Sequence, residues 1–126
     1  NEPRRTALEI LKNIIEKKLF FSEAKNAAGI SSAEDSAFVN MLVLTTLRHL
    51  VFIKKALKKF VKKKLPADVV AGEFALFLGT AEILYLNTPD YAVINSYVDL
   101  VKRADNKYVA GFVNAVLRNV AGRKTN

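Results

Sequence analysis

Basic side chains are the residues of this sequence most suited to chemistry, and the chemistry that they favour is the binding of phosphate groups. Seven lysines and no acidic residue occur between Lys54 and Lys64, in a chain of 126 residues whose net charge is +8. Lysine is a flexible point charge that contacts phosphate without reading bases. Near the start of the chain, Arg4 and Arg5 carry forked guanidinium groups that match phosphates and guanine edges. Charge alone leaves nucleic acid, an anionic membrane surface and an acidic protein open as partners.

Both basic groups also have a plain structural interpretation. The lysines can form a solvated helix face, with their stems covering the edge of the core. That face carries no aromatic residue, so we do not expect base stacking there. Arg4 and Arg5 oppose the dipole at a helix start, which indicates a role outside folding unless Glu2 and Glu9 offset them. We expect all of these cations at the surface.

Residues for catalysis or metal binding are scarce. The chain has no cysteine and one histidine, His49, which we interpret as a surface or helix-end residue because a metal site needs several ligands. Five scattered glycines form neither a phosphate-binding loop nor a dinucleotide fingerprint. Glu73 and Glu82 lie in an apolar helix pattern, where each is expected to cap, pair with a lysine or face solvent. We expect no catalytic residue, no metal and no cofactor in this chain.

The apolar spacing predicts one all-α domain over residues 1–126, with about seven helices and no strand. Proline favours a helix start, so Pro66 is expected to begin the fifth and most buried helix. Asn95 and Asn114 lie among apolar residues, which predicts buried amides that tie helices together. The expected helices cover residues 3–18, 22–28 with a Gly29 cap, 32–49 with a Ser31 or Ser32 cap, 51–65, 67–86, 91–104 and 108–121, with a frayed tail from residue 122 onward.

No apolar run reaches the length of roughly 18 residues that a membrane span needs. The start of the chain is polar and basic without an apolar segment behind it, so no signal peptide is indicated. The absence of cysteine fits a cytoplasmic protein. Residues 51–65 form a basic amphipathic stretch, which keeps a helix lying on a membrane surface as an alternative.

The sequence resembles NusB-like RNA-binding domains over nearly its whole length. The matching motifs are Arg4-Arg5 with Ala7 and Ile10-Leu11; Asp35-Ser36-Ala37-Phe38; Leu78-Gly79 and Ile83-Leu84-Tyr85-Leu86; Thr88-Pro89; Ala92-Val93-Ile94-Asn95 with Val98; and Gly111-Phe112-Val113-Asn114-Ala115-Val116-Leu117-Arg118. The resemblance implies an orthogonal bundle of two helical subdomains that binds RNA and has no activity of its own. Its implied RNA surface is the amino-terminal arginine end.

Two branches of the family are compatible with these motifs. The ending Ala115-Val116-Leu117-Arg118 is similar to the amino-terminal domain of Sun/Fmu-type 16S rRNA cytosine-5 methyltransferases, which implies 16S rRNA and a carboxy-terminal methyltransferase domain as partners. The other branch is the free transcription antitermination factor, which binds boxA-like RNA with a ribosomal protein. A basic adaptor for an acidic protein is a further alternative. The candidate RNA-contact residues are Arg4, Arg5, Lys54, Lys55, Lys58, Lys59, Lys62, Lys63 and Arg118, and the structural polar residues are Asn95 and Asn114.

Overall fold

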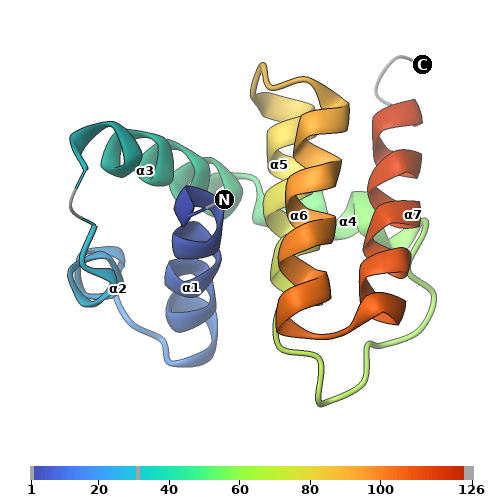
Figure 1. Ribbon diagram of the computed structural model, residues 1–126, viewed down its shortest axis with the longest axis horizontal. Helices are drawn as coiled ribbons and strands as arrows, with labels where there is room; N and C mark the ends of the chain where they lie inside the picture. Colours follow the sequence, from blue (N-terminus) through green and yellow to red (C-terminus); the bar gives the residue numbers. More distant parts are fainter. Residues whose placement is uncertain (1, 31, 124–126) are drawn as a thin grey trace.

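The computed structural model describes residues 2–30 and 32–123, and these residues form seven α-helices and no strand (Figure 1). The all-α prediction and the number of helices are confirmed. The helices are α1 (Glu2–Glu16), α2 (Phe21–Ala28), α3 (Ala33–Arg48), α4 (Leu50–Lys58), α5 (Gly72–Tyr85), α6 (Asp90–Ala104) and α7 (Lys107–Arg123).

The helices divide into two groups that meet along α1, α3 and α5. Helices α1 to α3 form one group, in which α1 packs on both α2 and α3. Helices α4 to α7 form the other, in which α5, α6 and α7 pack on one another and α4 crosses behind them (Figure 1). Contacts of α1 with α5 and α6, and of α3 with α5, join the two groups. The amino-terminal end of α1 therefore lies at the junction.

Helix α5 is the centre of the core, as its apolar composition predicts. Every residue from Gly72 to Ile83 except Glu73 is buried, because neighbouring helices cover α5 on all sides. Gly79 permits the closest of these contacts. A Cβ atom at Gly79 would lie 2.9 Å from a methyl group of Leu117 and 3.3 Å from the ring of Tyr97. The lack of a side chain at this position thus lets α6 and α7 approach the central helix.

Several predicted helix ends are confirmed. Gly29 ends α2 with a φ of 64°, a left-handed conformation that glycine adopts without steric cost. Ser32 caps α3, where its Oγ accepts a hydrogen bond of 3.3 Å from the amide of Asp35. Ser31, the other candidate cap, lies outside the described residues. The predicted tail is corrected in part, since Gly122 and Arg123 still belong to α7.

The predicted start of the fifth helix is wrong, and Asp105 explains the difference. Helix α5 begins at Gly72, whereas residues around Pro66 form a turn in which the amide of Val69 donates to the carbonyl of Pro66. The carboxylate of Asp105, from the α6–α7 connection, accepts hydrogen bonds of 2.7 Å from the amide of Val70 and 2.9 Å from that of Gly72. This acceptor, 33 residues further along the chain, satisfies the free amides that begin a helix.

The predicted lysine helix is also too long. Helix α4 ends at Lys58, and the amides of Phe60 and Val61 both turn back to the carbonyl of Leu57. Lys62 and Lys63 therefore lie in the connection to α5.

The prediction of buried amides at Asn95 and Asn114 is wrong. Asn95 is exposed, and Asn114 is half-buried. Neither amide makes a hydrogen bond to another residue of the described chain. The buried stripe of α6 consists of Val93, Ile94, Tyr97 and Val101, so Asn95 falls just outside it. An apolar neighbourhood in sequence did not place these two side chains in the core.

None of the described helices is long and apolar enough by itself to span a membrane. Helices α3 and α4 meet the length and composition criteria only when taken together, and a bend of 68° separates them.

Candidate nucleic-acid interface

The junction of the two groups of helices contains a buried cluster of charged and polar side chains. Arg4 of α1 donates through Nε and a terminal nitrogen to the two carboxylate oxygens of Glu82 on α5, and both distances are 2.7 Å. Tyr97 of α6 donates its hydroxyl to Glu82 Oε2 at 2.6 Å. The cluster therefore joins three helices through one carboxylate.

Burial and pairing set the electrostatics of this cluster. The side chain of Glu82 is 0% exposed and that of Arg4 is 12% exposed. Burial by itself lowers the pKa of Arg4, but the hydrogen bonds and negative charge of Glu82 outweigh it and raise that pKa above its ordinary value. Burial, together with the charge of Glu82, raises the pKa of Tyr97 well above its ordinary value. The arginine is thus charged and the phenol protonated at neutral pH.

This geometry corrects two expectations. Glu82 neither caps a helix, pairs with a lysine nor faces solvent, because its partners are Arg4 and Tyr97. Arg4 is not a surface residue, and its guanidinium also lies over the ring of Phe38 on α3, with the Cζ atom 5.3 Å from the ring centroid. A charged residue in an otherwise apolar helix was the signal for this cluster, but its partner could not be found from sequence spacing.

Arg5 has the surface position that the sequence predicts. Its side chain is 64% exposed and pairs with Glu2, three residues earlier on α1. The hydrogen bond from Arg5 to Glu2 lowers the pKa of Glu2 and raises that of Arg5. An exposed pair of this kind is screened by salt and contributes little to stability. Arg5 can therefore exchange Glu2 for an external anion.

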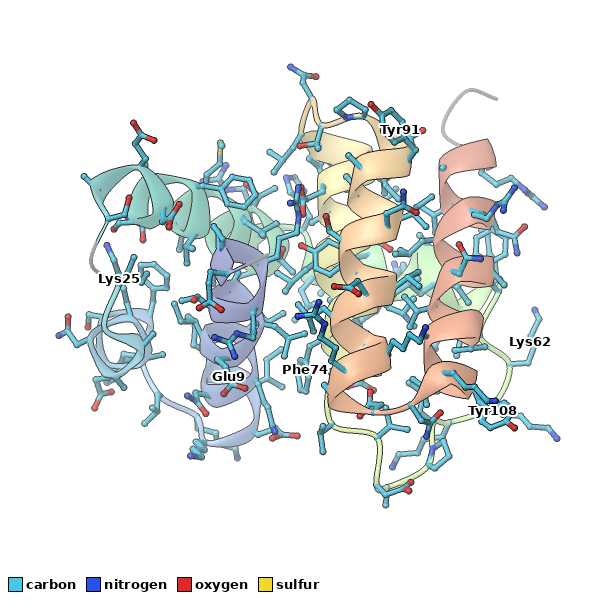
Figure 2. The ribbon with its side chains drawn as sticks, in the orientation of Figure 1. Glu9, Lys25, Lys62, Phe74, Tyr91 and Tyr108 are labelled. Carbon is cyan, nitrogen blue, oxygen red and sulfur yellow. The ribbon has the colours of Figure 1, made fainter. Side chains whose placement is uncertain are left out.

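The lysines between Lys54 and Lys64 are all exposed, as predicted. They do not form one face, however. Lys55 and Lys59 line one side of α4, whereas Lys54 and Lys58 line the other. Lys62 extends from the α4–α5 connection away from the helices (Figure 2). Arg118 is also exposed, on α7.

A groove lies between α4 and the carboxy-terminal half of α7, with a volume of about 390 Å³. We call it the α4–α7 groove. Phe52 and Phe60 line it together with Lys55, Lys59 and Arg123. The expectation that no aromatic residue accompanies the lysines is therefore wrong. Phe52 is 61% exposed, and Phe60 is half-buried.

A second hollow lies on the opposite side of α4, with a volume of about 270 Å³. Lys54 and Lys58 line it, but its aromatic residue, Phe77, is only 7% exposed. His49 lies at the end of α3, as predicted, and its ring stacks on Tyr85 with centroids 3.9 Å apart. Within residues 2–30 and 32–123, no three histidine or acidic side chains gather in a way that could hold a metal ion.

Comparisons with known proteins agree with this architecture. The NusB family model matches residues 1–122. The chain is 29% identical over 90 residues to ribosomal RNA small subunit methyltransferase B of Xanthomonas campestris pv. campestris. This match covers 71% of this chain and 21% of that protein. It is 28% identical over 92 residues to the transcription antitermination protein NusB of Thermodesulfovibrio yellowstonii, which covers 71% of this chain and 61% of that protein. The chain thus spans less than two thirds of either relative.

Two solved structures share the fold. A chain in the crystal structure of a plectonemic RNA supercoil superposes with a TM-score of 0.89 and 25% identity, over 98% of this chain and 94% of the other. A chain in the crystal structure of the antitermination factors NusB and NusE in complex with double-stranded RNA superposes with a TM-score of 0.84 and 24% identity, over 95% of this chain and 93% of the other. The superpositions show the shared fold, and the family match over residues 1–122 leads to one conclusion: this chain belongs to the NusB family.

Proposed function

We propose that this chain is a non-catalytic RNA-binding domain, which positions 16S rRNA for a cytosine-5 methyltransferase domain outside these 126 residues. Family membership supports RNA as the ligand class, and one matched relative is named as a small-subunit rRNA methyltransferase. The match covers only 21% of that relative, so most of the relative lies outside the region that resembles this chain. Arg118 after Ala115-Val116-Leu117 is the sequence feature that favours this branch.

The observation that carries the proposal is the set of cations without acidic partners on α4 and the segment after it. Within the described residues, no ion pair involves any lysine between Lys54 and Lys64. A helix face that serves solubility alone tends to pair its lysines with acids one turn away. Unpaired cations instead attract phosphates, whose contacts dominate the affinity of most RNA-binding surfaces.

The proposed RNA contacts are the exposed members of the predicted set. They are Arg5, Lys54, Lys55, Lys58, Lys59, Lys62, Lys63 and Arg118. Arg4 differs from them, because Glu82 occupies the fork of its guanidinium. An RNA contact by Arg4 would have to use its remaining N–H groups, so we assign it a role in holding α1 and Arg5 in place.

The second candidate function is that of a free antitermination factor in the cytoplasm, which would bind boxA-like RNA together with a ribosomal protein. The match to an antitermination protein over 61% of its length favours it, as does the superposition on a chain crystallised with NusE and double-stranded RNA.

Titration of the chain with three labelled RNAs tests both functions. These are a 16S rRNA fragment, a boxA-like RNA with and without the ribosomal protein, and a random RNA of equal length. Phosphate contacts make affinity fall steeply between 50 and 200 mM salt, by about a thousandfold for six contacts. Preference for the 16S fragment supports the first function, and preference for boxA that requires the ribosomal protein supports the second. No binding at low salt, or binding insensitive to salt, would refute RNA binding through this surface.

A matched calorimetric titration with S-adenosylmethionine tests the non-catalytic assignment. The chain has neither a cysteine nucleophile nor a glycine-rich cofactor loop, so we expect no heat of binding. A saturable isotherm would contradict the assignment.

A further inference from the structure

We infer that the α4–α7 groove binds single-stranded RNA, with a base stacked on Phe52 and the adjoining phosphates held by Lys55, Lys59 and Arg123. This inference rests on the proposed RNA-binding function. It adds to that function the form of the RNA and a place on the molecule away from the amino-terminal arginines.

The open ring of Phe52 is the first observation behind the inference. Phe52 is 61% exposed although it lies on a helix whose neighbours Ile53 and Leu57 are buried. Its ring borders a groove of about 390 Å³ with Phe60, Leu84 and the carboxy-terminal end of α7. An aromatic face at the edge of an apolar hollow offers a platform for a nucleobase, which every base can use because each has a π face.

The charges around the groove are the second observation. Lys55, Lys59 and Arg123 are its charged residues, and no acidic side chain lines it. The Arg123 guanidinium carbon lies 5.7 Å from the centroid of Phe60, so the cation is already held over the apolar floor. Lys55 and Lys59 are four residues apart and therefore project from the same side, one turn from each other. Cations spaced along an aromatic groove are the arrangement that single-strand binding sites use.

The cleft between α1 and α6 provides the contrast within the same molecule. It has a similar volume, about 320 Å³, but acidic side chains are mixed with basic ones along its walls. Glu9 and Asp99 face that cleft together with Arg103. Acidic and basic side chains balance along that cleft, whereas the α4–α7 groove presents one sign of charge.

Single-stranded RNA fits the groove better than a duplex. Helix α4 has nine residues and is therefore about 13 Å long, so the groove can accept only a few nucleotides. Bases of an A-form duplex are paired and stacked inside the helix, so only an unpaired base can be splayed onto an aromatic side chain. An acidic peptide without aromatic residues would match the charges but would leave the ring of Phe52 without a planar partner.

The experiment uses a short single-stranded RNA that carries one 2-aminopurine, and a duplex of the same sequence. The test variant is Phe52→Ala, and the matched control is Val51→Ala, since Val51 is 72% exposed on the same helix and does not line the groove. We expect Phe52→Ala to weaken single-strand binding by at least about fivefold and to abolish the fluorescence quenching that stacking produces. The control should change affinity by less than about twofold, and melting curves should show that both variants fold.

A charge-matched pair of variants gives the second comparison. Lys55→Gln with Lys59→Gln removes two cations from the groove, and Lys54→Gln with Lys58→Gln removes two from the other side of α4. The first pair should weaken single-strand binding clearly more than the second. Equal losses for the two pairs, no effect of Phe52→Ala, or binding of an acidic peptide that depends on Phe52 while RNA binding does not, would each overturn the inference. Wild-type chain that binds no RNA would refute the proposed function itself.

Discussion

We expect that Arg4→Met destabilises the fold far more than any change at Arg5, although the two arginines are adjacent. Arg4 supplies two hydrogen bonds of 2.7 Å to Glu82, whose side chain is completely buried. Methionine has a similar length and no charge. The substitution therefore removes both hydrogen bonds of Arg4 to the carboxylate and keeps the one that the hydroxyl of Tyr97 donates.

The magnitude follows from the burial of Glu82. Removing one partner of a buried ion pair costs about 3–5 kcal/mol, because the other charge stays desolvated. Small domains have about 5–15 kcal/mol of stability in total, so the loss is a large fraction of it. For a chain of this length, the melting temperature should fall by roughly 10–20 °C.

The assay is urea unfolding followed by circular dichroism at pH 7, with Arg5→Met as the matched control. Arg5 is 64% exposed and pairs with an exposed Glu2, so its replacement should change the free energy of unfolding by less than about 0.5 kcal/mol. The double variant Arg4→Met with Glu82→Leu should be more stable than Arg4→Met alone, because it removes the stranded charge.

Two results would refute this reasoning. One is an Arg4→Met variant within about 1 kcal/mol of the wild type, which would mean that the carboxylate is neutral or hydrated in the folded chain. The other is a double variant less stable than Arg4→Met, which would mean that the cost comes from lost packing and not from an unpaired charge.

Two further predictions concern helix capping and pH. Asp105→Ala should lower the free energy of unfolding in urea by about 1.5–3 kcal/mol, because three amides at the start of α5 lose their charged acceptor. Asp105→Asn should lower it less, and equal losses for the two variants would show that the carboxylate is not the cap. Because the pKa of Tyr97 is raised, the unfolded chain releases this proton near pH 10 while the folded chain keeps it, so stability falls as pH rises above about 10. Between pH 9 and 11, the free energy of unfolding should fall less steeply with pH in Tyr97→Phe than in the wild type, by up to about 1.4 kcal/mol per pH unit. An unchanged slope would contradict the raised pKa.

The sequence by itself determined the helical class and most of the helix ends. Local signals are sufficient for these, because a Gly29 in the left-handed conformation or a Ser32 cap depends on residues within one turn. The apolar composition of residues 67–86 likewise identified the central helix, since a helix that is apolar on all sides has to be covered by others. The exposed lysines also followed from sequence, because a run of like charges cannot be buried.

The tertiary structure alone decided which polar residues meet. Asp105 sets the start of α5 from 33 residues away, and Arg4 meets Glu82 across 78 residues. No spacing rule reaches over such separations, because they depend on how α1, α5 and α6 pack. The same limit explains why Asn95 was wrongly placed in the core. Helical periodicity orders the side chains around an axis, but the neighbouring helices determine which part of that circle they cover.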